Sequence, residues 1–482
     1  MNEKISILKN TSYLFIGSIF ARVFGFLLIV LIGREFGDVG LGQYAFSFAM
    51  VDILGILSEF GVYTFVVREV AKNGKLMKKY IDNYLALKIF LMISFILIYN
   101  IMITQIFDGE RLNLLRIASL CYAISFLNNP FYSIYQAKER MEFSSILHVI
   151  TSISIVVFGY VFISFGFGIE WILWGIIISH ILSLLINYLI VCKIFYFPIP
   201  RFDFKLWKLF IEKSWPFFFS TLFNTLYFRF DTIMLTFFKG DSVTGLYNAA
   251  YKLVSSLSFI PMSLAAAIYP ILSKTYLSEN KKFIKITHTI YRALFLLILP
   301  ITVGTIILSN QIIVLIFGET FIDSSLALSF LIIAEFFVFF NILNVIISNS
   351  IGEERNMLKI IVFYTLFNII FNAILIPRTS SYTGAAGVTI ISAMLNFTFG
   401  LILIRLKVKN FSIMSSYKTL LRAAIASGVM AIAIIYFFDT LNVIIKIIFG
   451  TIIYFITLLF LKEVNKSDWN FIKEIVYNKN KN

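Results

Sequence analysis

Six ionisable side chains interrupt stretches of sequence that are otherwise apolar. They are Arg22, Asp52 and Glu335 near the middle of such stretches, and Arg229, Asp231 and Lys252 nearer one end. A charge at the centre of a membrane helix costs about 2.5–3.5 kcal/mol, so these side chains are expected to face protein or water rather than lipid. Three are cations and three are anions, so interhelical ion pairing is one role and ligand binding is the other.

Two of the acidic residues share one helix face. Asp52 and Glu59 are seven residues apart, which is two helical turns. Carboxylates along one face can relay a proton or bind a coupling cation, and Asp231 and Glu335 are candidates for the same role. For Asp52 the alternative is structural, because it would neutralise Arg22 on the neighbouring helix.

The composition is that of a membrane protein. Of 482 residues, 59% are hydrophobic and 14% are charged, and the mean hydropathy is +0.89, whereas soluble domains have about 25% charged residues. The net charge of +15 does not indicate nucleic acid. The basic residues lie in short connections, where they act as topology signals and contact lipid headgroups.

About fourteen hydrophobic runs are long enough to span a membrane. The predicted spans are 11–33, 41–65, 83–106, 113–136, 142–165, 171–192, 214–238, 245–268, 287–309, 325–349, 358–377, 384–404, 418–438 and 443–461. Most Lys and Arg residues fall in connections on one side of the membrane, and this side is expected to be cytoplasmic. Both termini are therefore predicted to be cytoplasmic, in a protein of the plasma membrane. Lys88 and Arg292 lie close to that side and are expected to snorkel to the interface.

No metal, cofactor or catalytic site is indicated by the sequence. The histidines His148, His180 and His288 have no metal-ligand spacing. Cys121 and Cys192 fall in different spans, so a disulfide is not expected. The chain has no G-x-x-x-x-G-K-[ST] loop, so uphill work would depend on an ion gradient or the membrane potential.

An internal repeat has a constant offset of 203 residues. Gly37-Asp38 corresponds to Gly240-Asp241, and Lys78-Lys79 corresponds to Lys281-Lys282. Six predicted spans separate the equivalent helices, an even number, so two parallel six-helix lobes are expected, as in transporters. The predicted domains are an N-terminal lobe at 1–208, a second lobe at 209–410, and two further helices with a basic cytoplasmic tail at 411–482.

The first span and its flank carry a family resemblance. The residues are Arg22-Val23-Phe24-Gly25-Phe26, then Gly33-Arg34-Glu35-Phe36-Gly37 and Gly40-Leu41-Gly42-Gln43-Tyr44. With the lobes and span number, they make the whole chain resemble the MOP transporter superfamily, especially its polysaccharide transporter branch of Wzx-type lipid-linked oligosaccharide or O-antigen flippases. The R-V-x-G-F sequence is also similar to lipid II flippases. The further arginine of those proteins is absent, since Leu27 and Leu28 stand there.

This resemblance implies an all-α, MATE-like polytopic fold and transport of a polyprenyl-pyrophosphate glycan from the inner to the outer leaflet. Arg22, Arg229 and Lys252 would then hold the pyrophosphate, because arginine offers a planar fork to phosphate oxygens. The implied partners are the lipid-linked oligosaccharide, membrane lipids, and glycosyltransferases or a polymerase of the same pathway.

A second polar set consists of amides in the later spans. They are Asn341, Asn344, Asn368, Asn372 and Asn396. Asn368 and Asn372 are four residues apart and so share one helix face. Amides between membrane helices are more often packing contacts than ligands. A cavity that binds sugar uses the same chemistry, so both roles stay open.

Two other functions are alternatives to a flippase. A MATE-type cation-coupled multidrug exporter has the same fold, but its cavity would favour acids and aromatic residues, whereas Arg22 lies in the first span. A membrane glycosyltransferase or polymerase would need catalytic carboxylates or a D-x-D motif. The chain has no D-x-D, so we expect a transporter and not an enzyme.

Overall fold

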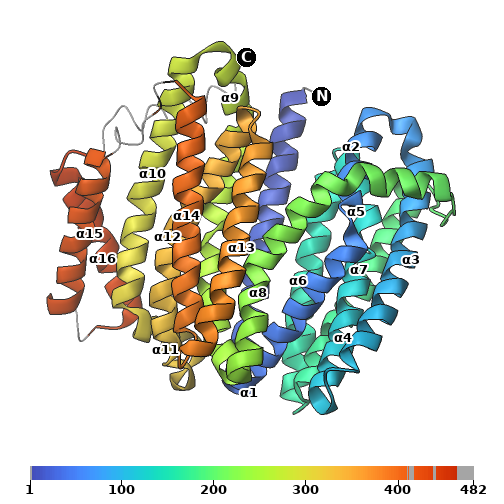
Figure 1. Ribbon diagram of the computed structural model, residues 1–482, viewed down its shortest axis with the longest axis horizontal. Coiled ribbons are helices and arrows are strands. Elements are labelled where there is room, and N and C mark those ends of the chain that lie inside the picture. Colours follow the sequence, from blue (N-terminus) through green and yellow to red (C-terminus); the bar gives the residue numbers. More distant parts are fainter. Residues whose placement is uncertain (1–2, 410, 412–416, 438–440, 464–482) are drawn as a thin grey trace. The chain divides into compact units, whose positions relative to one another are not determined.

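The computed structural model describes residues 3–409, 411, 417–437 and 441–463. These residues form helices and no strand (Figure 1). Lipid cannot hydrogen-bond a backbone, and a helix satisfies every N–H and C=O within its own segment, so apolar runs of this length fold as helices. The predicted all-α fold class is confirmed. The predicted basic tail after Glu463 lies outside the described residues.

The helices fall into two compact units. Unit 1 comprises residues 1–252 and 368–385, and unit 2 comprises residues 253–367 and 386–482. The first unit contains α1 (Glu3–Glu59), α2 (Val62–Lys72), η1 (Gly74–Leu76), α3 (Met77–Ile103), α4 (Gly109–Phe126), α5 (Asn129–Ala137), α6 (Met141–Ser164), α7 (Ile169–Ile194) and most of α8 (Phe204–Leu257). The predicted lobe boundaries at 208 and 410 stay a prediction.

The second unit is built from the later helices. It contains α9 (Phe259–Ser278), α10 (Asn280–Ile307), α11 (Ser309–Phe317), η2 (Glu319–Phe321), α12 (Ser324–Ser350), α15 (Tyr417–Phe437) and α16 (Val443–Phe460). Two further helices divide between the units: α13 (Glu354–Arg378) enters unit 1 at Asn368, and α14 (Thr383–Lys407) leaves it after Ala385.

Two helices are far longer than a membrane is thick. α1 has 57 residues and α8 has 54, about 80–85 Å at 1.5 Å per residue, against a hydrocarbon core of about 30 Å. Each is broken once at a glycine, Gly37 with φ 67° and Gly240 with φ 86°, a backbone region that favours glycine. Both breaks fall between predicted spans, so each long helix consists of two helical arms. The repeat thus appears in the backbone at an offset of 203 residues.

The two broken helices meet at a second glycine of the repeat. A Cβ atom on Gly42 would lie 1.9 Å from the carbonyl oxygen of Asp241, and one on Gly245 would lie 1.8 Å from that of Asp38. The Ser242 hydroxyl donates to the Asp38 carboxylate. The contact is therefore reciprocal between the two copies, and only glycine permits so close an approach.

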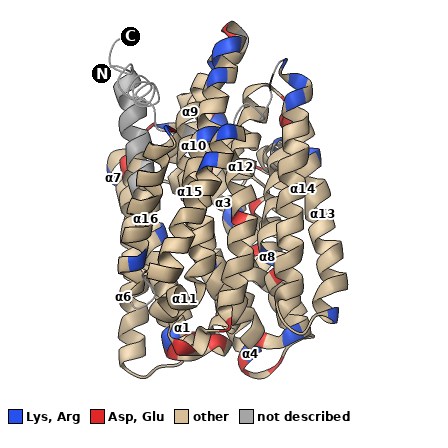
Figure 2. Cartoon of the chain, turned by 90° about the vertical axis from the view of Figure 1, so that its left-hand side faces the viewer, with Lys and Arg blue, Asp and Glu red and all other residues tan. Residues whose placement is uncertain are grey.

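Nine helices among the described residues are long and apolar enough to cross a membrane, or ten if one bent pair counts as a single span. Charged residues are sparse along the helices (Figure 2). The chain is therefore a multi-pass membrane protein, while the count of fourteen spans stays a prediction because the broken helices do not divide cleanly.

A carboxylate holds three helices of unit 2 together. Glu463, only 3% exposed, accepts hydrogen bonds from the Arg292 Nε at 2.8 Å and the Arg422 Nη1 at 2.6 Å. Thr419 also donates to it, at 2.5 Å. The three donors come from α10 and α15, and Glu463 follows α16, so the carboxylate ties these helices together. Arg292 is thus an ion-pair partner within the protein.

Candidate functional site

An ion pair in unit 1 joins the two broken helices. Arg229 Nε lies 2.8 Å from Asp52 Oδ2, where Asp52 belongs to the second arm of α1 and Arg229 to the first arm of α8. Their side chains remain 25% and 39% exposed. The protein therefore covers both side chains only in part.

The other two predicted cations lie close to this pair. Lys252 is within electrostatic range of Arg229, Arg22 and Asp52, and Arg22 is an exposed residue of α1. Three cations against one carboxylate leave two positive charges in excess at this place. We call Arg22, Arg229, Lys252 and Asp52 the cation cluster.

A second group of predicted residues gathers around Asp231, which is 6% exposed. One carboxylate oxygen accepts from the Tyr247 hydroxyl at 3.1 Å and the other from the Asn372 amide nitrogen at 2.6 Å. Asn372 also donates to the Asn368 oxygen at 3.1 Å. The Asn372 oxygen is buried and has no hydrogen-bond donor among the described residues. Asp231, Asn368 and Asn372 therefore bring four side-chain oxygens together, two from the carboxylate and one from each amide.

Glu59, the second carboxylate predicted on this face of α1, has partners of its own. Its carboxylate forms an ion pair with Lys88 and accepts from the Asn129 amide at 3.0 Å. Lys88 is 1% exposed and lies 5.1 Å from the centre of the Phe126 ring. The expectation that Lys88 snorkels to the interface is therefore wrong, because its ammonium has a buried carboxylate partner that the sequence does not reveal.

In unit 2, the remaining predicted residues hold helices together. Glu335 accepts a hydrogen bond from Ser258. Asn341 donates to the Ala393 carbonyl at 3.1 Å, and Asn344 donates to the Phe397 carbonyl at 3.2 Å. These bonds link α12 to α14, as amides do between membrane helices.

Asn396 on α14 is 6% exposed, and its side-chain oxygen has no donor among the described residues. The predicted amide set therefore divides. Asn341, Asn344 and Asn396 belong to unit 2, while Asn368 and Asn372 belong to unit 1 beside Asp231.

Two models of known protein families match the sequence. The sequence model described as "Polysaccharide biosynthesis protein" matches residues 7–276, more than half of the chain. The chain belongs to this family. The model described as "MatE" matches residues 216–375. As a member of the polysaccharide biosynthesis protein family, the chain has the MOP superfamily fold expected from its first span.

Relatives and solved structures agree with this placement. The chain is 23% identical over 468 residues to a "Probable low-salt glycan biosynthesis flippase Agl15" of Haloferax volcanii, covering 94% of this chain and 96% of the relative. It is 22% identical to a "Putative O-antigen transporter" of Shigella flexneri, covering 69% and 82%.

Among structures, "Lipid II flippase MurJ, inward closed conformation" aligns with a TM-score of 0.76 at 18% identity, covering 93% of this chain and 99% of that one. An "inward-facing conformation of a multidrug resistance MATE family transporter" aligns with a TM-score of 0.65 at 16% identity, covering 83% and 100%. At these identities the likeness concerns the fold alone.

Sequence reasoning missed the polar interior of unit 1. His148 and His180, 32 positions apart and on α6 and α7, line one pocket together with Asn128 and Asn129. No local spacing connects these residues, because they come from different helices. A weak signal was present, since each is a polar residue within an apolar stretch.

Proposed function

We propose that the chain flips a lipid-linked oligosaccharide, a polyprenyl-pyrophosphate glycan, from the inner to the outer leaflet for surface polysaccharide or glycoprotein biosynthesis. The family assignment, the transporter fold and the names of two long-matching relatives support this proposal. In it the protein acts by alternating access without catalysis. It lies in the plasma membrane with both termini cytoplasmic, and it receives its substrate from glycosyltransferases or passes it to a polymerase.

The cation cluster carries this proposal. A pyrophosphate diester has two negative charges, and the cluster has an excess of two positive charges. Arg22 and Arg229 each offer a fork of donors suited to phosphate oxygens. Asp52 orients Arg229 at 2.8 Å, so the guanidinium is positioned before the substrate arrives. A neutral or cationic substrate would gain nothing from such a site.

The test uses purified protein in liposomes and a fluorescent polyprenyl-pyrophosphate oligosaccharide. Arg22→Ala should reduce the flipping rate at least tenfold with normal reconstitution, and Arg22→Lys should retain part of it, because charge remains while the fork is lost. Arg116→Gln removes an exposed cation of α4 outside the cluster and serves as the matched control. Equal rates for Arg22→Ala and the control would show that the cluster does not bind the headgroup.

We further propose that the oxygens around Asp231 hold the cation or proton that couples transport to a gradient. Carboxylate and amide oxygens are the ligands that small hard cations prefer. The buried Asn372 oxygen has spare capacity to accept. Asp231→Asn should abolish the dependence of flipping on an imposed sodium or pH gradient, while Glu335→Gln in unit 2 should not. Gradient dependence that survives Asp231→Asn would contradict this role.

A MATE-type cation-coupled multidrug exporter is the second candidate, favoured by the MatE match to residues 216–375. The positive excess at the cation cluster disfavours it, since organic cations would be repelled. The same liposomes decide the matter when loaded with a cationic dye. Dye transport without lipid flipping would establish the exporter and reduce the cluster to helix-pairing charges.

A further inference from the structure

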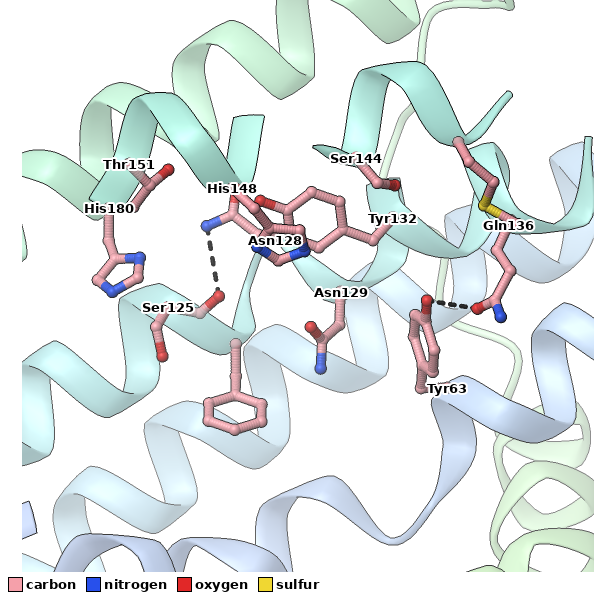
Figure 3. Close-up of a pocket in the computed structure, with 12 residues that line it drawn as sticks. Tyr63, Ser125, Asn128, Asn129, Tyr132, Gln136, Ser144, His148, Thr151 and His180 are labelled. Carbon is pink, nitrogen blue, oxygen red and sulfur yellow. Dashed lines mark hydrogen bonds between the residues drawn. The ribbon is translucent and has the colours of Figure 1, made fainter. Parts of the chain in front are cut away.

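Unit 1 contains a pocket of about 360 Å³ that neither the cation cluster nor the Asp231 group uses. Its lining comes from five helices, α2, α4, α5, α6 and α7. Figure 3 shows Tyr63 and Gln136 joined by a hydrogen bond at one end of the lining, His180 at the other end, and His148 with Tyr132 between them. This volume is at the low end of the range of about 300–1,000 Å³ typical of small-molecule sites.

The pocket opens away from lipid. On α6 the pocket residues Ser144, His148 and Thr151 follow one face. The exposed apolar residues Ile146 and Val157 follow another, roughly 160° away at 3.6 residues per turn. The apolar face is the one suited to lipid, so the pocket face is turned toward the protein interior.

The lining is polar and carries no Asp, Glu, Lys or Arg among the described residues. His148 stacks on Tyr132 with ring centres 4.7 Å apart and an interplanar angle of 23°. Within the described part of the chain, the ring nitrogens of His148 and His180 have no hydrogen-bond partner. Tyr63 donates to the Gln136 oxygen at 2.6 Å, which leaves the Gln136 amide nitrogen available as a donor. Several donors and acceptors therefore face the space unused.

We propose that this pocket binds one uncharged sugar ring of the transported glycan, a proposal that rests on the flippase function above. A sugar hydroxyl both donates and accepts, and so do a neutral imidazole and a primary amide. The apolar C–H face of a pyranose packs on aromatic rings, and Tyr132, Phe126 and the two imidazoles are aromatic rings of this lining. The absence of a charged lining residue favours a neutral ring over a uronic acid or an amino sugar with a free amine.

A metal ion fits the pocket less well. Among the described residues, no group of three or more His, Cys, Asp or Glu side chains is placed to hold one. Two imidazoles alone leave most of a transition metal's coordination to neutral amides and hydroxyls, which bind such ions weakly. The lining is therefore better suited to a ligand that forms many hydrogen bonds, such as a sugar, than to a metal ion that needs a few strong electron-pair donors.

The experiment is saturation-transfer difference NMR on the purified full-length protein in detergent, which detects weak binding and does not depend on flipping. The probes are the methyl glycosides of glucose, galactose, mannose and N-acetylglucosamine. At least one should receive saturation from the wild type, and His180→Ala and Gln136→Ala should each reduce that signal at least fivefold. His288→Ala, a histidine stacked on Phe411 in unit 2, is the matched control and should retain it.

Two results would overturn the proposal. One is the absence of saturation transfer to any of the four glycosides, and the other is an equal signal in wild type and both pocket variants. Unchanged gel-filtration elution and unfolding temperature confirm that a variant is folded, and two independent pocket variants guard against one that is not. Glycoside binding together with failed lipid flipping would uphold the sugar pocket while rejecting the flippase function, so the two failures are distinguishable.

Discussion

Replacing Gly42 by alanine should destabilise the protein by forcing apart the two broken helices. The new Cβ would lie 1.9 Å from the Asp241 carbonyl oxygen and also close to the backbone nitrogen of Gly245, whereas a carbon and an oxygen in contact need more than 3 Å. The obstructing atoms are backbone and cannot rotate away. Overpacking costs about 1–3 kcal/mol, and a clash with rigid backbone places this substitution at about 3 kcal/mol.

The reciprocal contact predicts an unusual double variant. Gly245→Ala clashes with the Asp38 carbonyl oxygen at 1.8 Å, so its cost alone should equal that of Gly42→Ala. Both clashes are relieved by the same separation of α1 from α8. Neighbouring sites that share one relaxation are not additive, so the double variant should cost about 3 kcal/mol and not about 6 kcal/mol.

The measurement is thermal unfolding of the purified protein in detergent, with Gly25→Ala as control. Gly25 lies on the same helix with nothing within 4 Å of its would-be Cβ, so alanine there should be neutral or stabilise by up to about 1 kcal/mol. If Gly42→Ala melts like Gly25→Ala, the close approach is not present in the protein. If the double variant loses the sum of the two single losses, the two glycines do not share one contact.

Two further predictions concern buried carboxylates. Burial raises the pKa of Glu463, but its hydrogen bonds and the nearby arginine charge outweigh burial and hold the pKa below its ordinary value. The ionised Glu463 therefore stabilises the protein above pH ~4.3, and this stabilisation is lost as the pH falls through the pKa of the folded state. Glu463→Gln should lower stability by about 2–3 kcal/mol at neutral pH and weaken the acid dependence of the unfolding temperature; a variant as acid-sensitive as wild type would contradict this. Lys88→Met should cost about 3–5 kcal/mol by leaving Glu59 buried without its cation; adding Glu59→Gln should restore most of the unfolding temperature, and no rescue would show that the pair is not the cause.

The breaks in the long helices could be predicted because they depend on local chemistry. Gly37 and Gly240 take a positive φ that other residues avoid. Each is followed by an aspartate, Asp38 or Asp241, at the same offset of 203 residues. The sequence therefore carried both the position of each break and the relation between the copies. Periodicity and composition were equally sufficient for the helical fold, since apolar runs in lipid have few other structures available.

The partners of the buried charges could not be predicted in this way. The sequence suggests an ion pair between Asp52 and Arg22. In the structure Asp52 pairs with Arg229, which is 177 positions away on the other copy of the repeat. Glu59 likewise pairs with Lys88 on a different helix. Helix periodicity gives the face on which a residue lies, but the rotation and depth of two helices against one another depend on their whole packing surfaces.

The charged residues of the cation cluster lie at similar distances along the helices from the two glycine breaks. Arg22 lies 15 residues before Gly37 and Asp52 lies 15 residues after it, so both arms of α1 place a charge about 22 Å from the break. Arg229 and Lys252 lie 11 and 12 residues from Gly240, about 17 Å from theirs. Because the two breaks meet at the glycine contact, these arms bring four charges into neighbouring layers. The glycine contact therefore sets the depth of the cluster, and a variant that separates the breaks should weaken the pyrophosphate binding that we propose for the cluster, without changing any charged residue.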